Sequence, residues 1–136
     1  MKKTGQQIEN DIYELVKEGS LNNIIGGKVY KYGTRPIDSK SEDAVVKFVT
    51  GLETQIASGI VVINVFIPDL RVASGVYMKN CARCEAIEAA ANKWIDDVRV
   101  LPEYQLSLVQ TIYAEHDSDI HEHFITIRIK YKYIKQ

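Results

Sequence analysis

The chain has 136 residues, of which 46% are hydrophobic and 26% are charged, and its formal net charge is -1 at pH 7. This length fits one domain, residues 1–136, that can bury a core of its own. The near-neutral balance gives no indication of a nucleic-acid-binding protein or of an acidic tail.

The amino terminus lacks the pattern of a secretion signal. Met1, Lys2 and Lys3 are followed by an amphipathic segment, and no apolar window approaches the length needed to cross a membrane. The two cysteines, Cys81 and Cys84, lie one helical turn apart and cannot supply a disulfide framework. The sequence therefore predicts a protein that is made and kept in the cytosol, without a membrane partner.

The first 43 residues predict a helix, a strand and a long loop. Thr4 is placed to cap the helix, with Gln7 at the capping-box position, and the helix is expected to end at Gly19. Its apolar stripe consists of Ile8, Ile12, Leu15 and Val16. Residues 28–32 alternate like a half-exposed strand, whereas residues 33–43 are rich in turn-forming types and predict a mobile loop.

Two adjoining apolar strands, residues 44–49 and 59–67, are the expected centre of one sheet. A hairpin turn at residues 51–54 joins them, and Ser58 with Gly59 predicts a bulge where the second strand begins. The second strand is apolar on both faces, so we expect helices on one side of it and a partner subunit or further structure on the other. This pattern favours assembly over catalysis.

The second half predicts a connector at 70–77, a helix near 78–98 beside the first helix, and two long strands at 104–114 and 123–134 joined by a polar loop. The buried face of that helix is expected to hold Cys84, Ile87, Ala91, Trp94, Ile95 and Val98. The predicted class is α+β, with a single mixed or antiparallel sheet, two helices on one face and the order α-β-β-β-α-β-β.

This order, the long loop before a strand hairpin, the apolar strand closed by Pro68-Asp69 and the final long hairpin resemble the phage tail-terminator family. Head-to-tail joining proteins and minor tail components are its near relatives. The resemblance covers nearly the whole chain. It implies a structural, non-enzymatic subunit of a phage or prophage, forming a ring that is usually hexameric and that ends the tail tube.

The resemblance also implies partners and locations. The partners are other copies of the chain, the tail tube protein and the head connector protein, and the protein is expected in the cytoplasm of the bacterial host and then in the tail or neck of the virion. The long loop is expected to become ordered on assembly, when its polar groups find partners. The expected interface residues are Arg35, Asp38 and Lys40 in that loop, Glu115, Asp117 and Asp119 in the acidic loop, and Arg128, Lys130 and Lys132 on the last strand.

The acidic and basic groups of this set lie one element apart. In a ring, the acidic edge of one subunit could meet the basic edge of the next and fix their relative position. A solvated strand face is an equal alternative for the basic residues. A third reading places them in the ring lumen, with weak, salt-sensitive contact to passing DNA.

Cys81 and Cys84 allow three interpretations. A Cys-x-x-Cys pair at a helix start can perform disulfide exchange, and His121 with His123 could complete a tetrahedral zinc site. However, the pair does not follow a buried strand, and the two histidines lie about forty residues away in an unusual spacing. The sequence favours ordinary helix packing, with Cys84 in the packed face and Cys81 nearer its edge, and predicts no catalytic residue, cofactor or metal.

A double-stranded RNA-binding module is the alternative from another functional class, because it shares the order of a helix, three strands and a helix. That module needs a basic cluster at the start of its second helix. Here Lys79 and Arg83 are interrupted by cysteines and followed by Glu85 and Glu88. The sequence therefore favours a structural assembly protein over a double-stranded RNA-binding module.

Overall fold

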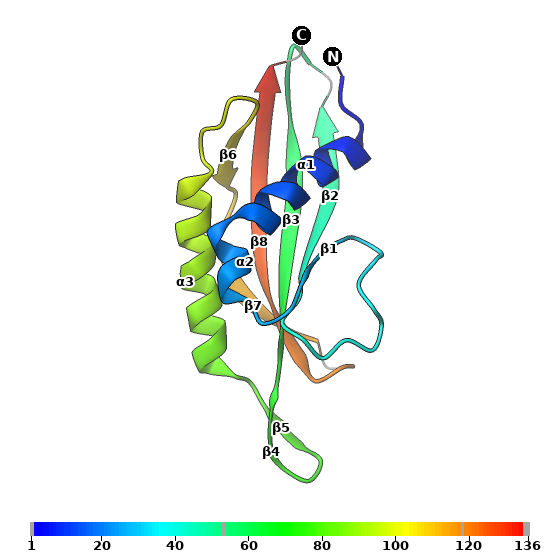
Figure 1. Cartoon of the computed structure of the whole chain (residues 1–136), viewed down its shortest axis with the longest axis vertical. Helices are drawn as coiled ribbons and strands as arrows, with labels where there is room; N and C mark the ends of the chain where they lie inside the picture. The colour runs from blue at the N-terminus through cyan, green and yellow to red at the C-terminus, as the bar shows by residue number, and fades with distance from the viewer. Residues whose placement is uncertain (1, 53, 118, 135–136) are drawn as a thin grey trace.

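A computed structural model describes residues 2–52, 54–117 and 119–134 and confirms the α+β class. Helices cover one face of a six-stranded sheet, and a separate two-stranded sheet extends from one end of it (Figure 1). The elements in chain order are α1 (Gly5–Glu18), α2 (Ser20–Ile24), β1 (Val29–Lys31), β2 (Ala44–Leu52), β3 (Ile56–Pro68), β4 (Leu70–Ala73), β5 (Val76–Met78), α3 (Cys81–Asp97), β6 (Gln105–Leu108), β7 (Tyr113–Asp117) and β8 (Glu122–Ile134).

The large sheet has the strand order β1-β2-β3-β8-β6, and β7 also pairs with β8. Its centre is the antiparallel pair of β3 and β8, which runs from Ile56 opposite Ile134 to Pro68 opposite Glu122. β1 pairs in parallel with β2, and the other pairs of this sheet are antiparallel. The sheet is therefore mixed.

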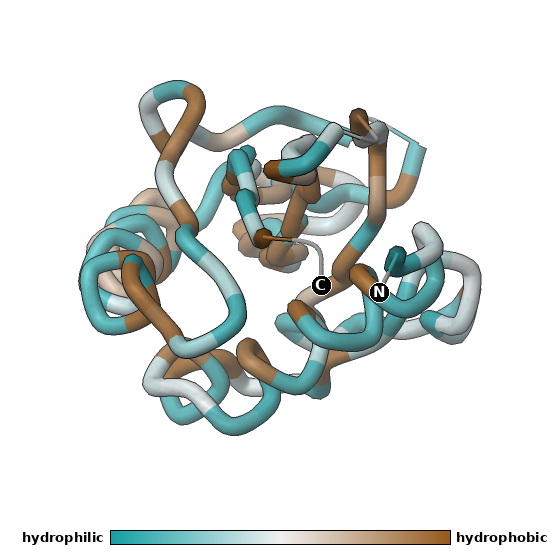
Figure 2. Tube along the Cα trace, turned by 90° about the horizontal axis from the view of Figure 1, so that it is seen from above, coloured by the Kyte–Doolittle hydropathy of each residue, from teal (hydrophilic) through white to brown (hydrophobic). Residues whose placement is uncertain are grey.

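Alternation along β3 and β8 separates a core face from an open face. Seen from above in Figure 2, hydrophobic positions gather in the central strands. The core-facing residues of the two strands, all buried, are Val61, Ile63, Val65, Ile67, Ile125, Ile127, Ile129, Tyr131 and Tyr133. The predicted alternation of the last strand is confirmed, and its other face carries the basic residues.

Two details of the predicted strands are wrong. The expected strand 104–114 is divided into β6 and β7, because the chain leaves the sheet at 109–112 before pairing again with β8. The predicted bulge also lies on the other strand, between Phe48 and Thr50 of β2. Gly59 is required for a different reason, since a Cβ there would collide with the Thr50 carbonyl oxygen.

Helix α1 begins with the predicted capping box. The backbone N–H of Gln7 donates to Thr4 Oγ1 at 3.3 Å, and the backbone N–H of Thr4 donates to Gln7 Oε1 at 2.8 Å. Ile8, Ile12 and Val16 are buried against the sheet. The reciprocal cap satisfies two amides at the helix start and fixes where α1 enters the fold.

Helix α3 buries the predicted face, including Trp94, but it has a different neighbour from the one expected. It packs against the short helix α2 rather than along α1 (Figure 1). The chain turns at Gly19, where a Cβ would lie 2.5 Å from Trp94 Nε1. The indole therefore occupies the space beside the α1–α2 junction, and α3 packs against α2.

Among the described residues, no helix has the length and apolar character needed to cross a membrane.

Candidate functional site

The predicted connector 70–77 is a small hairpin, β4–β5, that extends beyond the lower end of the sheet (Figure 1). Leu70 lies opposite Met78, and the pairing shifts register after Arg71. The hairpin is fixed at its base, where the Tyr77 ring stacks on His121 with centroids 3.9 Å apart. A two-stranded hairpin alone is marginally stable in water, so this segment needs further support.

The hairpin carries an unusual number of exposed large hydrophobic residues for its size. These are Leu70, Val72, Val76, Tyr77 and Met78, with exposed fractions from 38% to 58%. Strand alternation places Leu70, Val76 and Met78 on one side of the hairpin. Clustered exposed hydrophobic residues on a projecting element are typical of an interaction surface.

A buried ion cluster anchors the long loop 33–43 to the open face of the sheet. Arg35 Nε lies 2.9 Å from Asp43 Oδ2, and Arg35 Nη2 lies 3.1 Å from Glu122 Oε1. Both carboxylate side chains are 2% exposed and the arginine side chain is 12% exposed. The guanidinium also lies 4.1 Å from the centroid of the Phe66 ring. The loop therefore covers the lower end of the face that the helices leave open.

Hydrogen bonds keep the Asp43 carboxylate charged. Burial by itself raises the pKa of Asp43, but hydrogen bonds from Ser39, the Lys28 amide and Arg35 outweigh this effect and hold the pKa below its ordinary value. The pKa of Arg35 is raised, because its hydrogen bonds to Glu122 and Asp43 outweigh the cost of burial. The cluster is thus a structural clamp between the loop and the sheet.

The expectation that Arg35 finds its partners only on assembly is wrong, because its donors are used within the chain. Sequence spacing could not reveal this, since Glu122 lies 87 residues from Arg35. Asp38 and Lys40 are exposed on the same loop, beside the fully exposed Ile37. These two residues keep the surface position that an interface requires.

The predicted acidic and basic groups occupy different parts of the β7–β8 unit. Glu115 and Asp119 are exposed and Asp117 is half-buried, all three in β7 or the turn after it. Arg128 is half-buried and Lys130 and Lys132 are exposed on the open face of β8. Glu115 lies opposite Phe124, so roughly 20 Å of strand separates it from Lys130. At that separation Glu115 and Lys130 do not pair within one subunit.

The cysteines occupy the expected positions on α3. Cys81 is exposed, while Cys84 is 3% exposed, and both are free thiols. Burial is the main cause that raises the pKa of Cys84, which favours the unreactive thiol form. The Cys₂His₂ arrangement is not formed in the part of the chain that the structure describes, because His123 lies with His116 and Asp69 and not with the cysteines.

That histidine cluster lies at the base of the hairpin. His123 Nδ1 is 2.7 Å from Asp69 Oδ1, and His116 Nε2 is 3.9 Å from Asp69 Oδ2. The two imidazole rings stack with centroids 4.6 Å apart. Sequence reasoning missed Asp69 and His116 because their proximity depends on strand register. His116 lies directly opposite His123, and Ile67, two residues before Asp69, pairs with His123.

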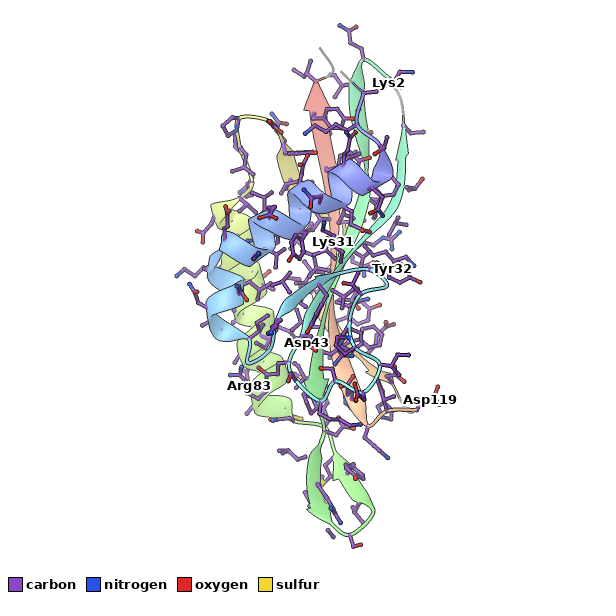
Figure 3. All side chains as sticks on the ribbon, turned by 45° about the vertical axis from the view of Figure 1, so that its right-hand side comes forward. Lys2, Lys31, Tyr32, Asp43, Arg83 and Asp119 are labelled. Atoms are coloured by element: carbon purple, nitrogen blue, oxygen red, sulfur yellow. The ribbon has the colours of Figure 1, made fainter. Side chains whose placement is uncertain are left out.

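Arg83 at the start of α3 is engaged within the chain. It binds Glu42 through two hydrogen bonds, of 2.8 Å from Nε and 2.7 Å from Nη2, and Nη2 also donates to the Ile24 carbonyl at 3.0 Å. Arg83 can be found in Figure 3, where Asp43, the residue that follows its partner Glu42 in the chain, is also marked. A phosphate-binding role for this helix start is not favoured, because its half-buried arginine already has a bidentate partner.

No protein-family model matches this chain, and no curated protein matches its sequence.

Proposed function

We propose that this protein is a structural assembly subunit that associates with copies of itself into a ring, in the manner of phage tail terminators. Its projecting β4–β5 hairpin is the observation that carries the proposal. Five large hydrophobic side chains are exposed on nine residues that extend beyond the core. A neighbouring subunit that covered them would stabilise a hairpin that has little support of its own.

A second copy of the chain offers suitable surfaces for this arm. β1 pairs with the outer edge of β2 along residues 44–46, and Glu9 of α1 occupies the Phe48 amide beyond them, so a further strand would pair with the remaining edge at residues 49–52. The acidic turn after β7 and the basic open face of β8 lie at different heights of one subunit. Such a polarity suits a head-to-tail contact, in which each subunit presents different surfaces to its two neighbours.

The placement in a phage tail rests on the family resemblance in element order. The ring would end the tail tube and present its other side to the head connector. Head-to-tail joining is the neighbouring role, with the same requirement for self-association. The host cytoplasm and the virion neck are the corresponding locations.

The proposal is tested by light scattering coupled to size-exclusion chromatography, followed by electron microscopy of the largest species. We expect a ring with a mass near six times the 15.4 kDa of one chain. A monomer at every concentration would contradict the proposal. Assembly into a species other than a closed ring would contradict the tail-terminator role. It would leave self-association through the hairpin to be tested separately.

A matched pair of triple variants separates the hairpin from general surface hydrophobicity. Val72→Ser, Val76→Ser and Met78→Ser together should abolish the ring and leave a folded monomer. The control, Ile56→Ser with Val100→Ser and Ile134→Ser, changes residues outside the hairpin that are 54%, 76% and 68% exposed. Its ring should persist. Equal loss in both variants would show that the hairpin is not the specific contact.

A further inference from the structure

We infer that Asp69, His116 and His123 form a binding site for one divalent transition-metal ion of the Zn²⁺ class. The three residues offer two imidazole nitrogens and a carboxylate oxygen, and these ligand atoms all lie within 4.8 Å of one another. This site differs from the Cys₂His₂ set considered from the sequence. It is also independent of self-association, because all three residues belong to one chain.

The geometry needs only a small adjustment to hold an ion. Zinc binds imidazole nitrogen and carboxylate oxygen at about 2.0–2.2 Å, which places its ligand atoms roughly 3–3.7 Å apart. Asp69 and His123 already approach more closely than this, at 2.7 Å. His116 Nε2 lies 3.9 Å from the carboxylate, and its side chain is 53% exposed, so it can rotate inward without disturbing the core.

The backbone fixes all three residues from well-paired strands. His116 and His123 are directly opposite on β7 and β8, a position in which Cβ atoms are about 5 Å apart. Asp69 follows the end of β3, and its amide donates to the His121 carbonyl at 2.9 Å. The ligands therefore come from three segments whose relative positions are set by the sheet, as a preorganised metal site requires.

The charge at Asp69 supplies an independent reason for a cation. Its side chain is 4% exposed. Among the described residues, its ion-pair partners are His116 and His123, with no lysine or arginine. Burial of a carboxylate is costly unless a positive charge is close to it. A divalent ion placed between the three side chains would provide that charge.

The donor set selects the kind of ion. Imidazole nitrogen with one carboxylate oxygen suits Zn²⁺, Co²⁺ and Ni²⁺, whereas Ca²⁺ and Mg²⁺ prefer oxygen ligands. Three protein ligands leave a further position for water on the exposed side of His116. Because Leu70 begins β4 directly after Asp69, the ion would also fix the base of the hairpin.

The test uses the full chain, treated with chelator and then titrated with Zn²⁺ by calorimetry and with Co²⁺ by visible absorption. We expect one ion per chain and a cobalt spectrum without thiolate charge-transfer absorption. Loss of an outer-shell partner typically weakens metal binding by about 10–100-fold, so loss of a ligand in His116→Ala or Asp69→Asn should weaken it by at least about 100-fold. The His116 side chain is exposed, so the His116→Ala variant should remain folded. It therefore tests the site even if the Asp69→Asn variant unfolds.

His121→Ala is the matched control, since it removes the third histidine of the chain, which stacks on Tyr77. Cys81→Ser and Cys84→Ser test the thiols. Unchanged affinity in the three controls supports the assigned ligands. The inference is overturned if the parent chain binds no ion, if His116→Ala binds as tightly as the parent chain, or if a cysteine variant loses the ion. Loss in His121→Ala equal to that in His116→Ala would also refute the proposed ligand set.

Discussion

Glu9 Oε1 accepts a hydrogen bond at 3.0 Å from the backbone N–H of Phe48, 39 residues further along the chain. Glu9 is 3% exposed, so this carboxylate is a buried acceptor at the outer edge of β2, just beyond the segment that β1 covers. The contact gives α1 a polar attachment to the sheet in addition to its apolar face. It also occupies an edge amide that would otherwise be free to pair with another chain.

Glu9→Ala should reduce the free energy of unfolding by about 1–3 kcal/mol, because it leaves the Phe48 amide without its acceptor. Glu9→Gln keeps an acceptor oxygen at the same reach and should lose less than half as much. Urea denaturation followed by circular dichroism measures both values. Equal losses in the two variants would mean that the charge or the packing of Glu9 matters, and not its hydrogen bond.

Arg35→Met should destabilise the protein strongly, because it leaves the buried carboxylates of Asp43 and Glu122 without their shared cation. Removing one partner of a buried ion pair typically costs about 3–5 kcal/mol. Thermal denaturation at neutral pH gives the measurement. Lys40→Met, an exposed substitution in the same loop, is the control and should change stability by less than about 0.5 kcal/mol.

The ion pair of Glu42 and Arg83 should make stability fall in acid. The hydrogen bonds from Arg83 hold the pKa of Glu42 below its ordinary value of 4.5 in spite of partial burial. A carboxylate with a depressed folded-state pKa contributes stability above the unfolded pKa and loses it as the pH falls through the folded value. The loss should therefore begin near pH 4.5 and continue at lower pH.

Urea midpoints between pH 3 and pH 7 test this sign. Glu42→Gln should be less stable than the parent chain at pH 7 and should lose less stability on acidification. Asp43, whose pKa is also lowered, adds acid sensitivity to both proteins. A Glu42→Gln variant with the same acid dependence as the parent chain would show that this ion pair contributes nothing measurable.

Local patterns in the sequence predicted the elements whose cause is local. The capping box of Thr4 and Gln7, the buried face of α3 and the alternation of β8 all follow from spacing within one segment. The overall α+β architecture followed from their order. These features depend on periodicity and on capping chemistry, which are visible without knowing the tertiary contacts.

The features that the sequence did not reveal depend on pairing between distant segments. Arg35 meets Glu122 because the loop folds over the open face, and Asp69 meets His123 because β3 and β8 pair along their whole length. The β4–β5 hairpin was missed for another reason. Its strands have only four and three residues, and their apolar side chains are exposed instead of alternating between core and solvent.

The two cysteines should respond differently to the same conservative substitution. Cys81→Ser changes an exposed side chain at the first residue of α3 and should alter the free energy of unfolding by less than about 0.5 kcal/mol. Cys84→Ser places a hydroxyl in the buried face of the helix. If the hydroxyl finds no partner there, the cost is about 1–3 kcal/mol.

A thiol-reactive probe provides the second measurement on the same chain. In the folded parent chain Cys81 should react rapidly, while Cys84 should react only as fast as the helix opens, because it is buried and its pKa is raised. Cys81→Ser should therefore abolish the fast phase, and denaturant should restore reaction of the remaining thiol. Rapid modification of folded Cys81→Ser would show that Cys84 is accessible and would contradict its place in the core.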